Sequence, residues 1–121
     1  MTAPSAPEPG PAPILVLVAP QDIVNIASAV RLAKNFGLTG IRLVNPEVFD
    51  PWRIEGIAHN TADLVARIEI CSSLSEALRD TVYSVALTAR GRAAKRTVLE
   101  PREAATELVA QSEFGPVGIV F

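Results

Sequence analysis

Short, unbroken apolar runs that alternate with amphipathic segments most limit how this chain can fold. The first run, Ile14 to Ala19, contains six apolar residues in succession. A run of this length and composition predicts a strand covered on both faces, which is typical of a parallel sheet. A second strand is expected at 40–45, after a segment with helical spacing. Strand, helix and strand in this order predict a right-handed βαβ unit.

The helix of this unit is expected over residues 25–35. Asn25 is expected as its N-cap, because an asparagine side chain can accept a hydrogen bond from a free backbone N–H of the first turn. Gly37 is expected to end the helix. Four apolar residues fall at helical spacing and are expected to face the sheet. These are Ile26, Ala29, Val30 and Ala33.

The rest of the chain continues the alternation and predicts an α/β fold, a mainly parallel sheet of about five strands with helices on both faces. Residues 1–13 contain five prolines and are expected to be a disordered tail, which leaves 14–121 as one domain. Because the last strand ends with the chain, the domain is expected to be incomplete at its C-terminal end. Further strands are expected at 66–71, 83–88 and 117–121, and helices within 53–65, at 74–80 and at 101–111.

Composition excludes several classes of function. No apolar run approaches the roughly 18 residues of a membrane-spanning helix, and the start lacks a secretory signal, so a cytoplasmic location without membrane contact is expected. With one cysteine, Cys71, and one histidine, His59, the chain has no metal-ligand cluster. Cys71 is expected to be a small buried residue. The net charge of −2 means that any RNA contact must come from a local patch.

Aromatic residues make up only 5% of the chain, which argues against a platform on which successive bases stack. Trp52 and Phe49 are expected to anchor a loop, with base stacking as the weaker alternative. Glycine-rich phosphate-binding motifs are absent from the sequence, which disfavours a dinucleotide or nucleoside triphosphate site.

Candidate functional residues gather where the predicted strands end. In open parallel α/β sheets, ligands bind beyond the carboxyl ends of the strands. Segments 20–25, 45–52 and 88–96 are expected to reach this edge. Four cations follow the strand at 83–88 closely enough to hold phosphates, although a solvated run of charges is the simpler alternative. They are Arg90, Arg92, Lys95 and Arg96.

Ser28, Arg31 and Asn35 are three or four residues apart and therefore share one helix face, turned away from the sheet. Arg31 is expected to lie near a helix N-terminus, which favours anions. By spacing alone, an ordinary solvated arginine is the stronger interpretation.

The segment from Ile14 to Pro46 resembles the opening of TrmH/SpoU-type RNA methyltransferases, which belong to the knotted SPOUT class. The family's first motif has an asparagine, a pair of small residues and an arginine six positions after the asparagine, matched here by Asn25, Ala27-Ser28 and Arg31. The resemblance covers residues 14–121 and is closest to the TrmJ-like branch. Later matches, in order, are AHNTADL, LSEAL, ALTARGR and LEPREAA.

This resemblance implies methyl transfer from S-adenosylmethionine to a ribose 2′-hydroxyl of RNA, with tRNA favoured over rRNA. It also implies that the full-length enzyme is a homodimer. The implied catalytic residues are Arg31 and Asn25, and the implied cofactor contacts are Thr88 and Ala89. The implied RNA contacts are Ser28, Arg90, Arg92, Lys95 and Arg96.

The chain departs from the family pattern at two positions. Ala27 replaces the usual glycine, and Leu87 stands where a small residue is usual. The family also continues past the last strand into two motifs that build the knot and most of the cofactor pocket. A catalytically incompetent fragment or an RNA-binding module is therefore the alternative function, and calorimetry with S-adenosylmethionine would then show weak or no binding. An unrelated flavodoxin-like or receiver-like α/β domain is the second rival, and it is disfavoured because receivers need an acidic cluster that 19–22 lacks.

Overall fold

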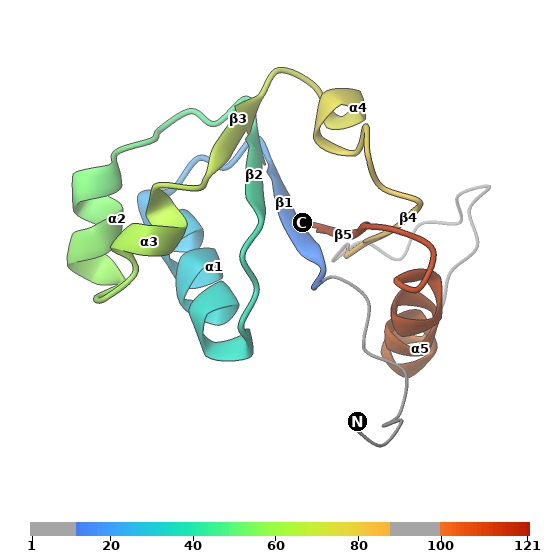
Figure 1. Cartoon of the computed structure of the whole chain (residues 1–121). Coiled ribbons are helices and arrows are strands. Elements are labelled where there is room, and N and C mark those ends of the chain that lie inside the picture. Colours follow the sequence, from blue (N-terminus) through green and yellow to red (C-terminus); the bar gives the residue numbers. More distant parts are fainter. Residues whose placement is uncertain (1–11, 88–99) are drawn as a thin grey trace, which may run out of the picture.

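The computed structural model describes residues 12–87 and 100–121. These residues contain a five-stranded sheet whose neighbouring strands all pair in parallel (Figure 1). The strands are β1 (Ile14–Val18), β2 (Ile41–Val44), β3 (Glu69–Cys71), β4 (Tyr83–Ala86) and β5 (Val117–Val120). Their spatial order is β3-β2-β1-β5-β4. The expected α/β fold with a parallel sheet is confirmed.

The helices are α1 (Ile23–Phe36), α2 (Pro51–Ile57), α3 (Ala62–Val65), α4 (Leu74–Ala77) and α5 (Pro101–Gln111). Two apolar clusters cover the two faces of the sheet. Leu15 and Leu17 of β1 pack with residues of α1, α2 and α3, whereas Val16 packs with Ala77 of α4. Alternate residues of one strand thus enter opposite layers, as the pleat of a strand requires. The prediction that β1 is covered on both faces is confirmed.

Helix α1 begins two residues earlier than expected, and Asn25 is not its N-cap. Asp22 takes this position with extended backbone, and its Oδ1 accepts a hydrogen bond from the Val24 N–H at 2.8 Å. An aspartate at this position satisfies a free N–H of the first turn, so the helix needs no cap from Asn25. Asn25 instead lies within the first turn. The C-terminal prediction is confirmed, because Gly37 ends the helix with φ of 71°, which glycine adopts without strain.

The region predicted to hold one helix, 53–65, holds the end of α2 and the whole of α3, and the Thr61 hydroxyl donates to the Ala58 carbonyl between them. Strand β3 lies at a sheet edge and is shorter than predicted. Ile70 is 47% exposed and does not share a covered face with Ile68. Helix α5 matches its predicted bounds of 101–111 residue for residue.

Strand β5 is internal, between β1 and β4. From β1 the chain runs outward through β2 to β3, and the remaining strands lie on the other side of β1. The order of strands therefore reverses between β1 and β5. In open parallel sheets the crevice at such a reversal is where ligands bind.

A cluster of charged residues joins β2 to α4 on the second face of the sheet. Arg42 is 9% exposed, and its two terminal nitrogens donate to both carboxylate oxygens of Asp80 at 2.7 and 2.8 Å. Arg42 also donates to the Ala77 carbonyl at 2.6 Å and pairs with Glu69, which pairs in turn with Arg79 at 2.9 Å. The hydrogen bonds from Arg42 lower the pKa of Asp80 to about 2. We call these four charged residues the Arg42 cluster.

Cys71 lies at the end of β3 and is buried, as expected. Its thiol has a raised pKa, chiefly because burial disfavours the thiolate and secondarily because Glu69 and Glu76 lie nearby. These surroundings favour the neutral thiol and therefore a packing role.

Candidate active site at the carboxyl edge of the sheet

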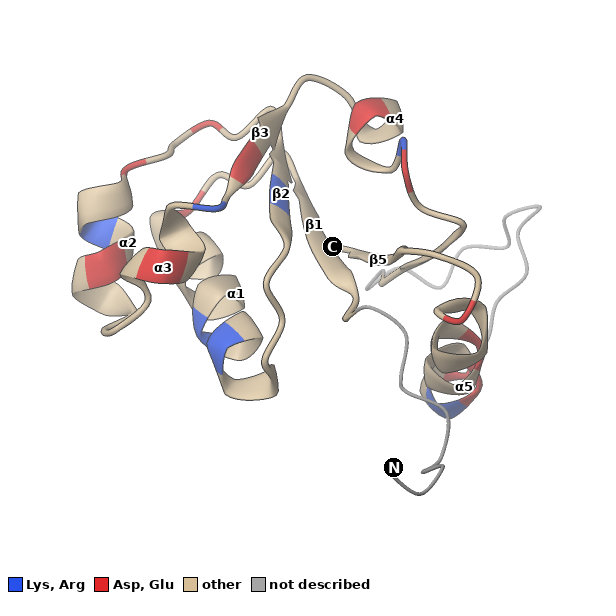
Figure 2. Ribbon diagram, in the orientation of Figure 1, with Lys and Arg blue, Asp and Glu red and all other residues tan. Residues whose placement is uncertain are grey.

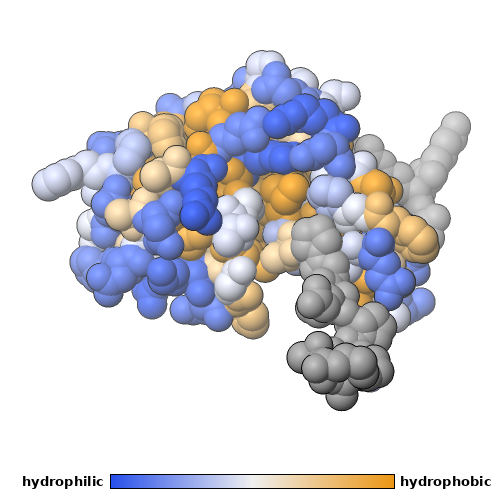
Figure 3. Space-filling model, viewed as in Figure 1, coloured by the Kyte–Doolittle hydropathy of each residue, from blue (hydrophilic) through white to orange (hydrophobic). Residues whose placement is uncertain are grey.

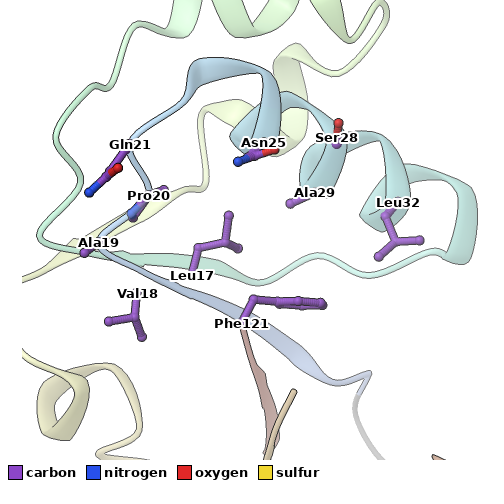
Figure 4. Close-up of a pocket in the computed structure, with 10 residues that line it drawn as sticks. All are labelled: Leu17, Val18, Ala19, Pro20, Gln21, Asn25, Ser28, Ala29, Leu32 and Phe121. Carbon is purple, nitrogen blue, oxygen red and sulfur yellow. The ribbon is translucent and has the colours of Figure 1, made fainter. Parts of the chain in front are cut away.

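A pocket of about 680 Å³ opens at the reversal point, between the end of β1, the first turns of α1 and Phe121 (Figure 4). Leu17, Leu32 and Phe121 give it apolar walls. Its volume lies within the range of pockets that hold small molecules. The predicted edge of the sheet thus carries a concave site, and segment 20–25 contributes to it as expected.

Three polar side chains line this pocket: Gln21, Asn25 and Ser28. None of the three side chains makes a hydrogen bond with another residue in the described parts of the chain. Figure 4 shows Asn25 and Ser28 on successive turns of α1, above a floor that includes Leu17 and Phe121. An apolar pocket with a few free polar groups can orient a bound molecule through those groups.

The structure brings two of the predicted α1 residues, Asn25 and Ser28, to the pocket, but Arg31 does not line it. Arg31 is exposed and lies three residues beyond Ser28 on the same helix face. Within the described residues it forms no ion pair. The guanidinium is therefore available to an anion that lies along α1.

The prediction that Arg31 lies near the helix N-terminus is wrong. Because α1 begins at Ile23, Arg31 follows eight residues later, about 12 Å along the axis. The N-terminus itself carries the Asp22 carboxylate as its cap. Any anion that Arg31 binds is thus held by the guanidinium rather than by the first-turn amides.

Six of the predicted site residues lie outside the residues that the structure describes. Leu87 is the last described residue before this gap, and its N–H donates to the Val120 carbonyl at 2.8 Å. Their predicted roles in cofactor and RNA binding remain predictions. The six are Thr88, Ala89, Arg90, Arg92, Lys95 and Arg96.

The charges on the described elements are mixed in sign. Figure 2 shows basic and acidic segments interspersed over α1, α2 and α3, without an extended basic surface on these helices. The Lys34 Nζ of α1 lies 3.6 Å from a carboxylate oxygen of Asp63 in α3, so Lys34 is already paired. Of the two cations on α1, Arg31 is therefore the one that is open to an anionic ligand.

The departure at Ala27 lies away from the pocket. Ala27 is fully buried and packs in the cluster between α1 and the sheet. Its methyl group therefore fills core volume and does not crowd the polar side chains of the site.

Sequence reasoning missed one residue of the pocket and mispredicted another residue at this edge. Gln21 was within an expected segment but was not singled out, although its place between a strand end and an N-cap was a usable signal. Trp52 was expected to anchor a loop, and this is wrong because it is 86% exposed. Helix α2 buries Ile54, and its C-cap Ala58 is buried too, which puts position 52 on the opposite side of the helix from the core.

The described residues also bear on metal binding and membrane insertion. No group of three or more His, Cys, Asp or Glu in residues 12–87 and 100–121 could hold a metal ion. Over the same ranges, no helix has the length and apolar character required to cross a membrane.

The known proteins with similar sequences and structures are described as methyltransferases or methylases. TrmJ from Klebsiella pneumoniae, a tRNA (cytidine/uridine-2′-O-)-methyltransferase, is 34% identical over 107 residues, which are 88% of this chain and 44% of that protein. The crystal structure of TrmJ from Z. mobilis ZM4 superposes with a TM-score of 0.81 at 32% identity, over 91% of this chain and 49% of that one. A probable methylase family protein from Haemophilus influenzae gives a TM-score of 0.76 at 32% identity, over 88% and 45%.

The chain thus spans slightly less than half the length of these relatives. The sequence profile of the SpoU rRNA Methylase family matches residues 12–121, which is nearly the whole chain. Sequence and fold agree, and the resemblance noted in the sequence is confirmed. The chain belongs to the SpoU rRNA Methylase family.

Proposed function

We propose that this chain supplies the substrate-facing part of an RNA methyltransferase that transfers a methyl group from S-adenosylmethionine to a ribose 2′-hydroxyl of tRNA. The observation that carries this proposal is the arrangement along α1. Asn25 and Ser28 present free polar side chains to the pocket, and the exposed Arg31 lies one turn beyond. The TrmJ relatives are tRNA methyltransferases, which supports the choice of tRNA over rRNA.

The described residues fit part of the cofactor. The pocket offers apolar walls and enough volume for a nucleoside-sized group, and the carboxamides of Gln21 and Asn25 can bind polar substituents. Thr88 and Ala89, which follow β4 in the chain, are proposed as further contacts. S-adenosylmethionine, when bound, would supply an electrophilic methyl group on a sulfonium.

The proposed roles of the protein's residues follow from charge. A ribose hydroxyl is a weak nucleophile, and negative charge grows on its oxygen as it attacks. Arginine is almost never deprotonated, so Arg31 is not a free-standing base. We assign it to bind the adjacent phosphate and to stabilise the developing alkoxide. Asn25 would donate a hydrogen bond near the reacting ribose.

Contacts with the rest of the RNA are proposed for Ser28 and for the four cations at 90–96. Cations hold the phosphate backbone through a salt-dependent interaction that is independent of sequence. A homodimer and a cytoplasmic location are also proposed for the protein that contains this chain, in keeping with tRNA as the substrate.

The test is methyl transfer from labelled S-adenosylmethionine to tRNA transcripts, followed by nuclease digestion and chromatography of the nucleosides. The proposal expects label in 2′-O-methyl nucleosides and none in transcripts with a 2′-deoxy substitution at the target nucleotide. Label confined to bases would contradict it. Binding of tRNA without transfer, together with no heat of binding for S-adenosylmethionine in calorimetry, would instead support an RNA-binding module.

A further inference from the structure

We propose that Gln21 is a binding residue of the pocket, and that its carboxamide holds the hydrogen-bonding edge of a nucleobase. This inference rests on the proposed function and deepens it, because it assigns one part of a ligand to one side chain. The starting observation is that Gln21 lines the pocket and is exposed, with no side-chain hydrogen bond to another described residue. Figure 4 shows it in the loop that joins β1 to α1, ahead of Asn25.

The backbone on both sides of Gln21 is fixed, whereas its own side chain is free. Before it, the Ala19 N–H and the carbonyl of the buried Pro20 are hydrogen-bonded to the end of β2 and the loop that follows, at 2.7 and 3.0 Å. After it, the Asp22 side chain caps α1. A fixed backbone reduces the conformational freedom that is lost when the carboxamide binds a ligand.

The backbone conformation of Ala19 brings the chain to the pocket wall. Its φ is 49°, in the left-handed region that an alanine seldom adopts. Asn45, which follows the neighbouring strand β2, has φ of 46°. Such conformations persist where the surrounding contacts enforce them, and they are concentrated at functional sites. The turn at Ala19 ends the direction of β1, and the next two residues, Pro20 and Gln21, line the pocket.

The charges around the pocket indicate which part of a ligand can lie beside Gln21. None of the described residues that line the pocket is charged. A phosphate placed there would lack a cation among these residues, and burial of an unpaired charge is costly. The carboxylate of Asp22, next in the chain, also repels a phosphate, whereas the exposed Arg31 lies nine residues further along. The phosphate therefore belongs at Arg31, and an uncharged group belongs at Gln21.

A nucleobase is the uncharged part of RNA and of S-adenosylmethionine that fits these groups. Its faces are apolar and can lie against Leu17 or the ring of Phe121, which line the same pocket (Figure 4). Its Watson–Crick edge presents a hydrogen-bond donor beside an acceptor, and the carboxamide of Gln21 has the same two groups. Two parallel hydrogen bonds can therefore form. Ribose has hydrogen-bonding groups but no flat apolar face.

The experiment compares methyl transfer by the protein that contains this chain with transfer by Gln21→Met. Methionine keeps a long, flexible side chain but removes the hydrogen bonds of the carboxamide. The substrates are a tRNA and the same tRNA with a ribose but no base at the target nucleotide. With the complete tRNA, transfer by the variant should fall roughly 5- to 150-fold, the range for loss of one bidentate contact with a base.

The abasic tRNA distinguishes the two sources of the base. If Gln21 holds the base of the target nucleotide, the protein and the variant should transfer to abasic tRNA at equal rates. If it holds the adenine of S-adenosylmethionine, the loss should persist with abasic tRNA, and the KM for S-adenosylmethionine should rise by the same factor. A general structural defect would produce neither pattern.

The matched control is Gln111→Met. Gln111 is the chain's other glutamine, lies on α5 and does not line the pocket, so its replacement should retain transfer. An unchanged rate in Gln21→Met would overturn the inference and leave the proposed function standing. So would a loss that persists with abasic tRNA while the KM for S-adenosylmethionine stays constant. No transfer by the unsubstituted protein would overturn both.

Discussion

The pocket at the carboxyl edge and the Arg42 cluster use polar side chains in opposite ways. In the Arg42 cluster every charged group has a partner. Arg42 by itself has three, namely Asp80, Glu69 and the Ala77 carbonyl. At the pocket, Gln21, Asn25 and Ser28 have no side-chain hydrogen bond to another described residue. Paired groups stabilise the fold, whereas groups that are left free can bind a ligand.

The two regions also differ in how far neighbouring elements cover them. The Arg42 cluster closes the second face, where α4 lies against β2. The pocket adjoins apolar surface that no described element covers, and Figure 3 shows hydrophobic residues at the surface between the α1–α3 layer and α5. A site in which apolar walls and unpaired polar groups are both open has the composition of a binding site.

The largest effect of a substitution is expected on methyl transfer, at Arg31 beside the pocket. Arg31→Ala should reduce methyl transfer to tRNA about 10²-fold or more, because it removes a group that stabilises charge in the transition state. The midpoint of thermal unfolding should not change, since Arg31 is exposed and unpaired among the described residues. Lys34→Ala is the control on the same helix and should retain transfer. Full activity in the Arg31 variant would refute its catalytic role.

Substitutions in the Arg42 cluster should instead lower the free energy of unfolding. Asp80→Ala should lower the free energy of unfolding by about 2 kcal/mol, less than for a fully buried pair because the Asp80 side chain is 45% exposed. Urea denaturation measures this change. Asp63→Ala, which removes an exposed pair with Lys34, should lower the free energy of unfolding much less than Asp80→Ala does. Equal losses in the two variants would show that burial does not distinguish these pairs.

The same ion pair predicts a dependence on acid. The pKa of Asp80 is lowered from 3.8 to about 2, so the folded chain binds this proton less readily than the unfolded chain. Its stabilising contribution is therefore complete above pH 3.8 and is lost as pH falls through about 2. Urea denaturation at a series of pH values should show a shallower acid loss for Asp80→Asn than for the unchanged chain. Identical slopes would contradict the assignment.

The smallest expected effect is a difference in stability between a variant of the helix cap, Asp22, and a variant of the pocket residue Asn25. Asp22→Ala should destabilise the chain by about 1 kcal/mol through loss of the cap, whereas Asn25→Ala should change stability by less than about 0.5 kcal/mol. Asn25→Ala should nevertheless reduce methyl transfer, because its carboxamide lines the pocket. Thermal unfolding and the transfer assay together test this. A destabilised Asn25 variant would mean that its side chain is structural after all.

The amino-acid sequence alone was sufficient for the parallel α/β fold, the bounds of α5 and the position of Gly37 at the end of α1. These features depend on local patterns: apolar periodicity, a proline in the first helical turn and a glycine with positive φ. The first motif could also be read directly, because Asn25, Ser28 and Arg31 are neighbours along one helix.

Only the tertiary structure decided how these residues are used. Asp22 and Asn25 are both good caps by type, and backbone geometry selected Asp22. The exposure of Trp52, the burial of Ala27 and the pairing of Arg42 with Asp80 depend on which helices pack together. Such contacts join residues far apart in the chain, so no local spacing could reveal them. The pocket exists because β5 lies beside β1, and these two strands are far apart in the sequence.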